Sequence, residues 1–501
     1  MTLAKRFVVS CWLGVLFAGF AAPEAVAQPI PAHPRDLVFE DLEFEPPDPA
    51  AHRHELSNGA VAYIVPDRAL PLVTVSVIVR TGAYLEPADK EGLAALTGSQ
   101  MRAGGAGALA PAAFDDEAAF LAAQLSSSIG GTSGSASVNS LTKDLDASLD
   151  LLFDMLRRPR FDPDRLELAK SQALQQMERR NDSTQSIEVR EWGRLLRGAD
   201  HFTTSPSTRA SIESITRDDL VAFHREYYHP GNFLFAVSGD VEPADFLARL
   251  EARMADWPAR AAVATPVPKP EHGIRPGLYV VDKDDVNQGR VVIGHLATMR
   301  DNPDRYALMV MNDILGGGGF TARLLTRIRS EEGLAYSAYS SFGFGTYYPG
   351  AFRASFQSRS ETVARAAAIV LEEIDRIRSE PVTEAELGTS KASFIETFSR
   401  SFSSAASTAR LFANDEYTGR DPSYLAAYRD RIRSISGEDV LRVAREYLHP
   451  DRLIVLVVGD RTTIEAGDPD NPDVRLADLA GGAITGIPLP DPFTMQYPSS
   501  P

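Results

Sequence analysis

The feature that most constrains the fold is a segment that occurs twice, 220 residues apart. Residues 215–240 read ITRDDLVAFHREYYHPGNFLFAVSGD, and residues 435–460 read ISGEDVLRVAREYLHPDRLIVLVVGD. A match of this length at a fixed offset indicates a duplicated unit of structure. With 501 residues, the chain is also too long for one hydrophobic core and long enough for two or three domains. We therefore expect two tandem domains of like fold.

Both copies of the segment predict a helix followed by a strand. Thr216 and Ser436 are N-cap candidates, each with an Asp three positions later. Apolar residues then recur on one helical face, and a His-Pro pair ends the helix because the residue before Pro disfavours the α region. Strand-type runs follow at 233–237 and 453–458. With β-rich runs near the start of each copy, each domain is expected to be α+β, an antiparallel-rich sheet with helices packed on one side.

Composition shifts along the chain give the expected boundaries. The proline-rich stretch around Pro266, Pro268 and Pro270 reads as an extended linker. Residues 28–50 and 481–501 are Pro-rich or weakly patterned, which is typical of arms that wrap a surface or of disordered segments. We predict a signal peptide, an N-terminal arm, a first domain, a linker, a second domain and a C-terminal tail at residues 1–27, 28–50, 51–258, 259–275, 276–463 and 464–501.

The first residues resemble a cleavable targeting segment. Lys5 and Arg6 precede an apolar run at 7–22, and Ala25-Val26-Ala27 is a small-x-small cleavage site. A membrane anchor is the alternative, but the run is short for a span and ends in Ala and Pro. Cleavage after Ala27 predicts a periplasmic or secreted protein. No other stretch has the length and apolarity of a transmembrane helix.

Charge and cysteine usage exclude several classes of function. The net charge of −17 argues against nucleic-acid or anionic-membrane partners, because both need clustered Lys and Arg. The only cysteine, Cys11, lies inside the predicted signal peptide. The mature chain would then have neither a disulfide framework nor a thiolate metal site.

Candidate chemistry lies in the second domain. Residues 324–339 read LLTRIRSEEGLAYSAY and follow the glycine run Gly316–Gly319, with Arg329 seven positions before Tyr336. A Tyr hydroxyl can donate to the oxyanion of a tetrahedral intermediate, and a guanidinium can bind a substrate carbonyl or hold the Tyr. The alternative is an exposed Arg on an amphipathic helix with a core Tyr, and a glycine run that only caps a helix.

The tandem α+β halves, the glycine run and the Arg/Tyr element together resemble the pitrilysin/insulinase superfamily of zinc peptidases. The branch that looks most similar holds the short subunits related to mitochondrial processing peptidase and to bacterial paired peptidases. The resemblance covers roughly residues 50–460 and implies half of a clam-like peptidase.

In active members of this family, the first domain carries His-x-x-Glu-His, and a second Glu downstream completes the zinc site. The matching stretch here is EGLAALTGSQM at 91–101, so that Ala95 and Ser99 hold the ligand positions and Gly98 the general-base position. Gln176 falls at the third-ligand position. Ala and Gly offer no ligating group, and a hydroxyl and an amide are poor zinc ligands. We expect no zinc at this site.

No other catalytic pattern replaces the lost one. His224 and His229 are five residues apart, which puts them about 140° apart on a helix, and the sequence has no His-x-x-x-His. A nucleophile elbow of the form Gly-x-Ser-x-Gly is also missing from the sequence. We expect the histidines to be structural.

The resemblance implies roles for the retained residues. Arg329 and Tyr336 match the family's pair that faces the zinc of another domain. In the family, a glycine-rich loop joins the partner subunit and contributes to substrate entry. The residues that match this loop are Gly316, Gly317, Gly318, Gly319 and Phe320. The chain would be the non-zinc subunit of a heterodimeric metallopeptidase, inactive alone, with zinc in the partner and a peptide or unfolded protein as substrate. The main alternative is a non-enzymatic structural or peptide-binding homologue, like a core subunit of a respiratory complex. A stand-alone zinc enzyme is the third, and stoichiometric zinc in the isolated chain would support it.

Overall fold

The computed structural model describes residues 33, 37, 43–258, 260–271, 275–479 and 483–498. The predicted signal peptide, with Cys11, lies outside the described residues. Residues Glu45–Pro501 form one compact unit, which holds two sheets and the helices around them. Within the described ranges, no helix is long and apolar enough to cross a bilayer.

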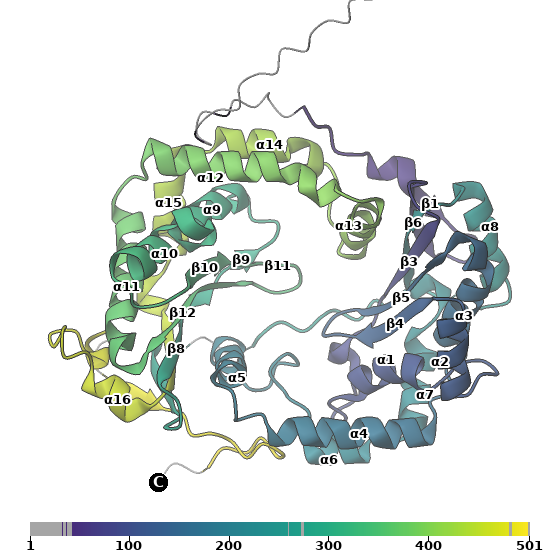
Figure 1. Ribbon diagram of the computed structural model, residues 1–501, viewed down its shortest axis with the longest axis horizontal. Coiled ribbons are helices and arrows are strands. Elements are labelled where there is room, and N and C mark those ends of the chain that lie inside the picture. The colour runs from purple at the N-terminus through teal and green to yellow at the C-terminus, as the bar shows by residue number, and fades with distance from the viewer. Residues whose placement is uncertain are drawn as a thin grey trace, which may run out of the picture. The chain divides into compact units, whose positions relative to one another are not determined.

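The unit holds two six-stranded sheets (Figure 1), and five strands of each follow the same order. The first sheet runs β1-β2-β6-β3-β5-β4, with β1 (Arg53–Glu55), β2 (Val61–Pro66), β3 (Leu72–Val79), β4 (Gln124–Ile129), β5 (Gly134–Leu141) and β6 (Phe233–Gly239). The second sheet runs β10-β12-β8-β13-β7-β14, with β7 (Gly277–Asp282), β8 (Gln288–Leu296), β10 (Ala338–Phe342), β12 (Ala351–Arg359), β13 (Ile454–Gly459) and β14 (Ile484–Gly486). A short ribbon pairs β9 (Thr298–Met299) with β11 (Phe344–Gly345).

The strand pairings confirm two homologous α+β halves. The order β2-β6-β3-β5-β4 corresponds to β7-β13-β8-β12-β10, and the first pair of each series, β2 with β6 and β7 with β13, is parallel. The remaining pairs of each series are antiparallel. The predicted fold class is therefore correct.

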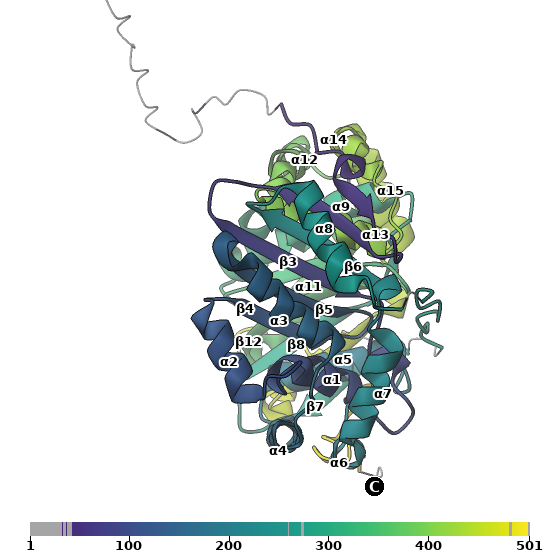
Figure 2. The same cartoon turned by 90° about the vertical axis from the view of Figure 1, so that its right-hand side faces the viewer.

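Helices follow the strands in each half. In the first half they are α1 (Leu93–Ala103), α2 (Pro111–Phe120), α3 (Leu145–Arg157), α4 (Pro163–Glu178), α5 (Thr184–Arg197), α6 (Arg209–Ser214), α7 (Arg217–Tyr227) and α8 (Pro243–Met254). In the second half they are α9 (Arg305–Asn312), α10 (Arg323–Leu325), α11 (Val363–Ser379), α12 (Glu384–Thr397), α13 (Ala405–Tyr417), α14 (Tyr424–Ser434), α15 (Gly437–Tyr447) and α16 (Arg461–Ala466). Figure 2 shows α3 and α8 lying across one face of the first sheet.

The repeated segment forms the helix and strand that its sequence predicts. α7 and α15 both begin with a capping box, in which Thr216 and Asp219, and likewise Ser436 and Asp439, exchange hydrogen bonds between side chain and backbone. The Asp219 carboxylate accepts the Thr216 N–H at 2.7 Å, and the Asp439 carboxylate accepts the Ser436 N–H at 3.0 Å. These bonds satisfy N–H groups that the first turn of a helix leaves free. β6 and β13 follow the two helices as interior strands.

Each half also contributes one helix to the other half's sheet. α5 packs on β8 and β13 of the second sheet, and α13 packs on β2, β3 and β6 of the first (Figure 1). The two helices start at residues 184 and 405, so the exchange follows the duplication. The sequence predicted helices on one side of each sheet, and the structure adds this one helix on the opposite face.

The exchanged helix α5 explains why β13 is an unbroken apolar run. Ile187 and Trp192 of α5 form a core with Ile454, Leu456 and Val458, while the alternate residues of β13 face the main core of the second half. A strand that is covered on both faces needs apolar residues at every position.

Ion pairs fix both exchanged helices. The Glu188 carboxylate on α5 is only 1% exposed and accepts bonds from Arg290 at 2.8 Å and Arg353 at 2.9 Å. On α13, Glu416 accepts from Arg53 at 2.8 Å and from the Tyr63 hydroxyl at 2.5 Å. Removing the partners of Glu188 would leave an uncompensated buried charge, so this set holds α5 in a single position. The Arg53–Glu416 pair is partly exposed, with side chains 36% and 24% exposed, and ties α13 to the first sheet together with Tyr63.

The described C-terminal residues also join the two halves. β14 pairs with β7 in the second sheet, and the chain then crosses to the first half. There, Asn181 and Arg180 donate to the Pro490 and Pro492 carbonyls at 2.8 and 3.1 Å. The Tyr497 hydroxyl donates to the buried Glu191 carboxylate at 2.8 Å. Residues 483–498 thus wrap a surface, whereas the domain boundaries themselves stay predictions.

Candidate functional site

The structure brings Arg329, Tyr336 and Phe320 into one cluster, which we call the arginine clamp. The guanidinium carbon of Arg329 lies 4.5 Å from the centre of the Tyr336 ring and 5.0 Å from the centre of the Phe320 ring. Cation–π attraction at these distances holds the cation between the rings. Tyr336 is 81% exposed and Phe320 is 77% exposed. Tyr336 is therefore not a core residue, and the alternative interpretation of the motif is wrong on that point.

The glycine run is a tightly packed turn. Asp313–Gly317 is a π-helical turn, and a Cβ on Gly316 would lie 2.5 Å from the Ser340 backbone nitrogen of β10. Gly319 has a φ of +63°, which side-chain-bearing residues rarely adopt. The run thus lets the chain pass close to β10 and then turn so that Phe320 reaches Arg329. A simple helix cap would need only one of these glycines.

Arg329 itself lies on a second π-helical turn, Thr326–Glu331. Such turns are rare and are found frequently at functional sites. Three nearby arginines differ in their partners: Arg323 and Arg327 bind carboxylates of neighbouring helices, and Arg329 packs against the two exposed rings.

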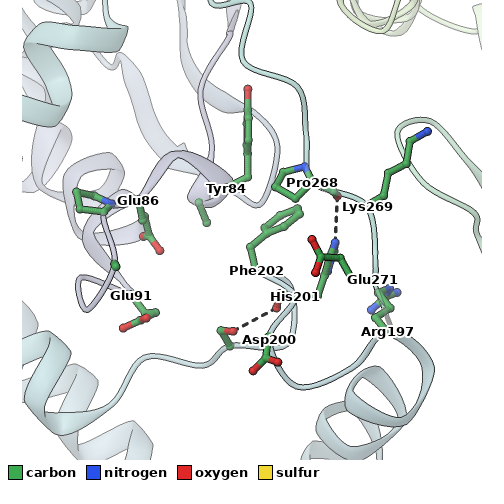
Figure 3. A pocket seen from close by; sticks show the side chains of 14 residues that line it. Tyr84, Glu86, Glu91, Arg197, Asp200, His201, Phe202, Pro268, Lys269 and Glu271 are labelled. Atoms are coloured by element: carbon green, nitrogen blue, oxygen red, sulfur yellow. Dashed lines mark hydrogen bonds between the residues drawn. The ribbon is translucent and has the colours of Figure 1, made fainter. Parts of the chain in front are cut away.

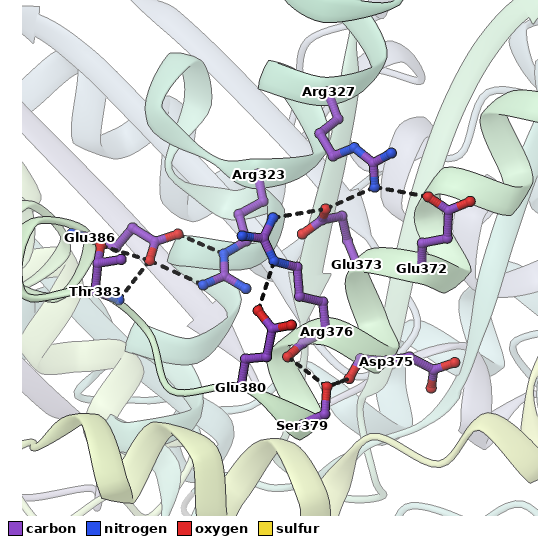
Figure 4. Close-up of polar contacts among 10 residues, drawn as sticks. All are labelled: Arg323, Arg327, Glu372, Glu373, Asp375, Arg376, Ser379, Glu380, Thr383 and Glu386. Atoms are coloured by element: carbon purple, nitrogen blue, oxygen red, sulfur yellow. Dashed lines mark hydrogen bonds and ion pairs between the residues drawn. The ribbon is translucent and has the colours of Figure 1, made fainter.

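An ion-pair network anchors the segment that carries Arg329 (Figure 4). Arg323 makes a bidentate pair with Glu386 of α12, at 2.6 and 3.0 Å. Arg327 donates to Glu372 at 2.9 Å and to the fully buried Glu373 at 3.0 Å, both on α11. The sequence analysis missed this network, because the carboxylates lie 45 to 63 residues away along the chain.

The network lowers the pKa of the Glu386 carboxyl. Burial by itself raises the pKa of the Glu386 carboxyl, but the bonds from Arg323 and Thr383 outweigh it and lower the pKa from 4.5 to about 2. The ionised form is therefore strongly favoured in the folded protein. Since the folded-state pKa lies below the unfolded one, the stabilisation is complete above pH 4.5 and is lost as the pH falls toward 2.

We expect Glu386→Gln to lower the free energy of unfolding by about 2 kcal/mol at pH 7, because it leaves the buried Arg323 without its charge partner. Urea unfolding at several pH values measures the effect, and the difference from the parent should shrink as the pH falls from 4.5 to 2. Glu384→Gln, at an exposed position in the same helical turn, is the control and should change little. Equal losses for the two variants at pH 7 would contradict the anchoring role.

The position that matches the general base of the family's zinc site is closed. Gly98 on α1 is buried, and a Cβ there would lie 2.3 Å from the Ile129 backbone nitrogen of β4. The Ser127 hydroxyl donates to the Gly98 carbonyl at 2.7 Å. The backbone of β4 thus fills the space into which a general-base side chain would project.

The remaining positions of that site carry no metal ligands. Ala95 and Ser99 are exposed on α1, and Gln176 is exposed on α4. The Ser99 hydroxyl is bonded within its own helix, to the Leu96 carbonyl at 3.0 Å. Among the residues that the structure describes, no group of three or more His, Cys, Asp or Glu could hold a metal ion.

A pocket of 320 Å³ lies beside the start of α1 (Figure 3). Its Glu86 carboxylate accepts the N–H groups of Gly92 and Ala94 at 3.1 and 2.7 Å, and burial raises the pKa of this carboxyl to about 7. His201, nearly buried in the same wall, donates to the Pro268 carbonyl of the linker at 3.2 Å. The sequence analysis singled out neither residue. Both bind the chain's own backbone, so we assign them structural roles.

The clam-like peptidases have this architecture. It consists of two matching sheets, each with its own helices on one face and the helix from the other half on the opposite face. Two family profiles match the chain: Insulinase (Peptidase family M16) over residues 64–191, and Peptidase M16 inactive domain over residues 214–394. The chain belongs to peptidase family M16, the insulinase family.

Some sequence relatives are named as proteases and others as non-peptidases. An uncharacterized zinc protease of Mycobacterium leprae is 29% identical over 266 residues, which span 50% of this chain and 57% of that protein. The non-peptidase homolog YmxG of Helicobacter pylori is 23% identical over 405 residues, which span 77% of this chain and 83% of that protein. Membership of the family therefore does not by itself decide activity.

Solved structures share the fold. A peptidase M16 inactive domain from Pseudomonas fluorescens superposes with a TM-score of 0.72 at 25% identity, over 81% of this chain and 97% of that chain. The periplasmic protease PqqL from Escherichia coli superposes with a TM-score of 0.69 at 17% identity, over 87% of this chain but only 49% of that chain. The present chain thus corresponds to about half of PqqL.

Proposed function

We propose that this chain is the non-zinc subunit of a heterodimeric zinc metallopeptidase, and that it supplies Arg329 and Tyr336 to the zinc site of a homologous partner. The observation that carries the proposal is the contrast between the two halves. The first half lacks the family's zinc ligands and has its general-base position closed by the backbone of β4, whereas the second half holds an exposed Arg/Tyr pair in a fixed geometry.

The geometry of the arginine clamp suits a role in trans. Within the described part of the chain, no residue hydrogen-bonds to the Tyr336 hydroxyl. This hydroxyl would donate to the oxyanion that forms on a substrate carbonyl, and Arg329 would hold the ring and add a positive charge nearby. Zinc held by the partner would polarise the same carbonyl and activate water.

The length of this chain relative to PqqL supports the need for a second subunit. The chain matches about half of PqqL, and the first half of that protease, solved alone, also superposes on 87% of this chain with a TM-score of 0.68. We infer that a unit of similar size, here from another chain, completes the enzyme. In line with the predicted cleavage after Ala27, we place the pair in the periplasm or outside the cell.

The test is to mix the purified mature chain with a homologue that carries His-x-x-Glu-His. An internally quenched unstructured peptide reports hydrolysis, and light scattering reports the assembly. We expect a one-to-one complex, hydrolysis only in the mixture, and no stoichiometric zinc in this chain alone. Zinc bound by the isolated chain with peptidase activity would instead identify a stand-alone enzyme.

A structural or peptide-binding role is the second candidate, because a relative aligned over 83% of its length is named a non-peptidase homolog. That role predicts a stable complex in which no pairing hydrolyses the peptide.

A further inference from the structure

We propose that a second cavity of this chain binds a segment of the peptide substrate and prefers segments with acidic or small uncharged side chains over basic ones. The proposal rests on the proposed function, because it names the substrate class that this subunit selects. The cavity has a volume of 690 Å³ and lies between the first sheet and the exchanged helix α13. The volume is within the range of about 300–1,000 Å³ that is typical of ligand sites.

Hydroxyl groups dominate the sheet side of this cavity. Ser76 on β3 and Ser135 and Ser137 on β5 line it together with Ser126 on β4. Ser126 and Ser137 share a hydrogen bond of 2.8 Å across the two strands. Each such pair uses only one of its two O–H donors, so donor and acceptor capacity remains for a bound chain. A wall of this kind can bind peptide groups whatever their sequence.

Charge makes the cavity selective. Among the described residues that line it, Arg410 of α13 is the one charged side chain, and no carboxylate is present. The nearby acids of α13 bind elsewhere: Asp415 is buried and accepts from Tyr424 at 2.9 Å, and Glu416 is paired with Arg53. In the described part of the chain, Arg410 has no ion-pair partner.

These features predict which segment fits. An acidic side chain in the cavity would pair with Arg410, and a small polar one would meet the hydroxyls. A Lys or Arg would lose hydration, find no carboxylate and be repelled by Arg410. The preference is opposite to the field of the whole chain, whose net charge is −17. A measured preference for acid would therefore come from the cavity itself.

Fluorescence anisotropy of the mature chain alone tests the proposal. The probes are three labelled unstructured peptides of equal length, one Asp/Ser-rich, one Ala/Ser-rich and one Lys/Ser-rich, at about 0.15 M salt so that long-range fields are screened. We expect the acidic probe to bind about two- to fivefold more tightly than the basic one, which is the range that one partly exposed ion pair supplies. Arg410→Glu should reverse this order.

The control is Arg433→Glu, which makes the same change of charge on the exposed surface of α14. It should leave the order of the three probes unchanged. The proposal is overturned if no probe binds, if the Lys-rich probe binds as well as the others, or if the two variants act alike. The assay needs neither partner nor zinc, so its failure is distinct from a failure of the mixed enzyme to hydrolyse a peptide.

Discussion

Replacing Tyr336 by Phe is expected to lower kcat of the mixed enzyme by about 10²–10³-fold, the usual effect of removing one oxyanion donor. The substitution keeps the aromatic ring, so the stacking with Arg329 at 4.5 Å and the assembly with the partner should survive. Only the hydroxyl is lost. Steady-state kinetics with the quenched peptide measure the effect, and KM should change much less than kcat, because the donor acts mainly in the transition state.

Tyr339→Phe is the matched control for this experiment. Tyr339 lies three residues later on β10, is 44% exposed, and is not part of the arginine clamp. Removal of the Tyr339 hydroxyl should change kcat by no more than about twofold from the parent value. A Tyr336→Phe enzyme with the parent's kcat would refute the role of the hydroxyl, although assembly with a partner could still stand.

Restoring the family's zinc motif is expected to fail. The variant carrying Ala95→His, Gly98→Glu, Ser99→His and Gln176→Glu should bind no stoichiometric zinc and should unfold at a lower temperature. The reason is steric: a Cβ at residue 98 would lie 2.3 Å from the Ile129 nitrogen, so that α1 and β4 must separate before the Glu can be accommodated. Overpacking of a core costs about 1–3 kcal/mol, and a larger loss is expected here because the contact is with backbone.

Metal analysis after dialysis and a thermal melt measure the two effects. The control keeps Gly98 and changes only the three exposed positions, 95, 99 and 176. It should melt close to the parent, which would assign the damage to residue 98. Stoichiometric zinc in the fourfold variant, with an unchanged melting temperature, would show that the helix and strand can separate and that the site was merely emptied.

Local pattern predicted much of the architecture. The repeat, with its caps at Thr216 and Ser436, defined two helix–strand units that the structure places at equivalent positions. The apolar run at 453–458 predicted the strand β13, but it did not say what covers the two faces of that strand. An amphipathic pattern on α5 shows that one face is buried and leaves open against which sheet it packs. The exchange of helices therefore follows from tertiary packing that sequence pattern does not encode.

The candidate site was predictable in its residues but not in its construction. Arg329 and Tyr336 came from a motif, whereas their contact depends on two π-helical turns and on Gly319, which local propensity does not distinguish from ordinary helix ends. The sequence analysis did not single out Arg323 and Arg327, because their partners are distant in sequence. At residue 98, the sequence showed only that the family's general-base carboxylate is missing. The structure shows why the carboxylate cannot return.

The exchanged helices have a consequence for how substrate would enter. Glu188 holds α5 on the second sheet, and Glu416 holds α13 on the first, so a hinge motion that parts the two sheets must break both sets of ion pairs, of which that of Glu188 is buried. This subunit should then move as a rigid body during turnover. Opening of the mixed enzyme to admit a peptide, and closing around it, would occur between the two chains, and the rate of that step would be set by their interface.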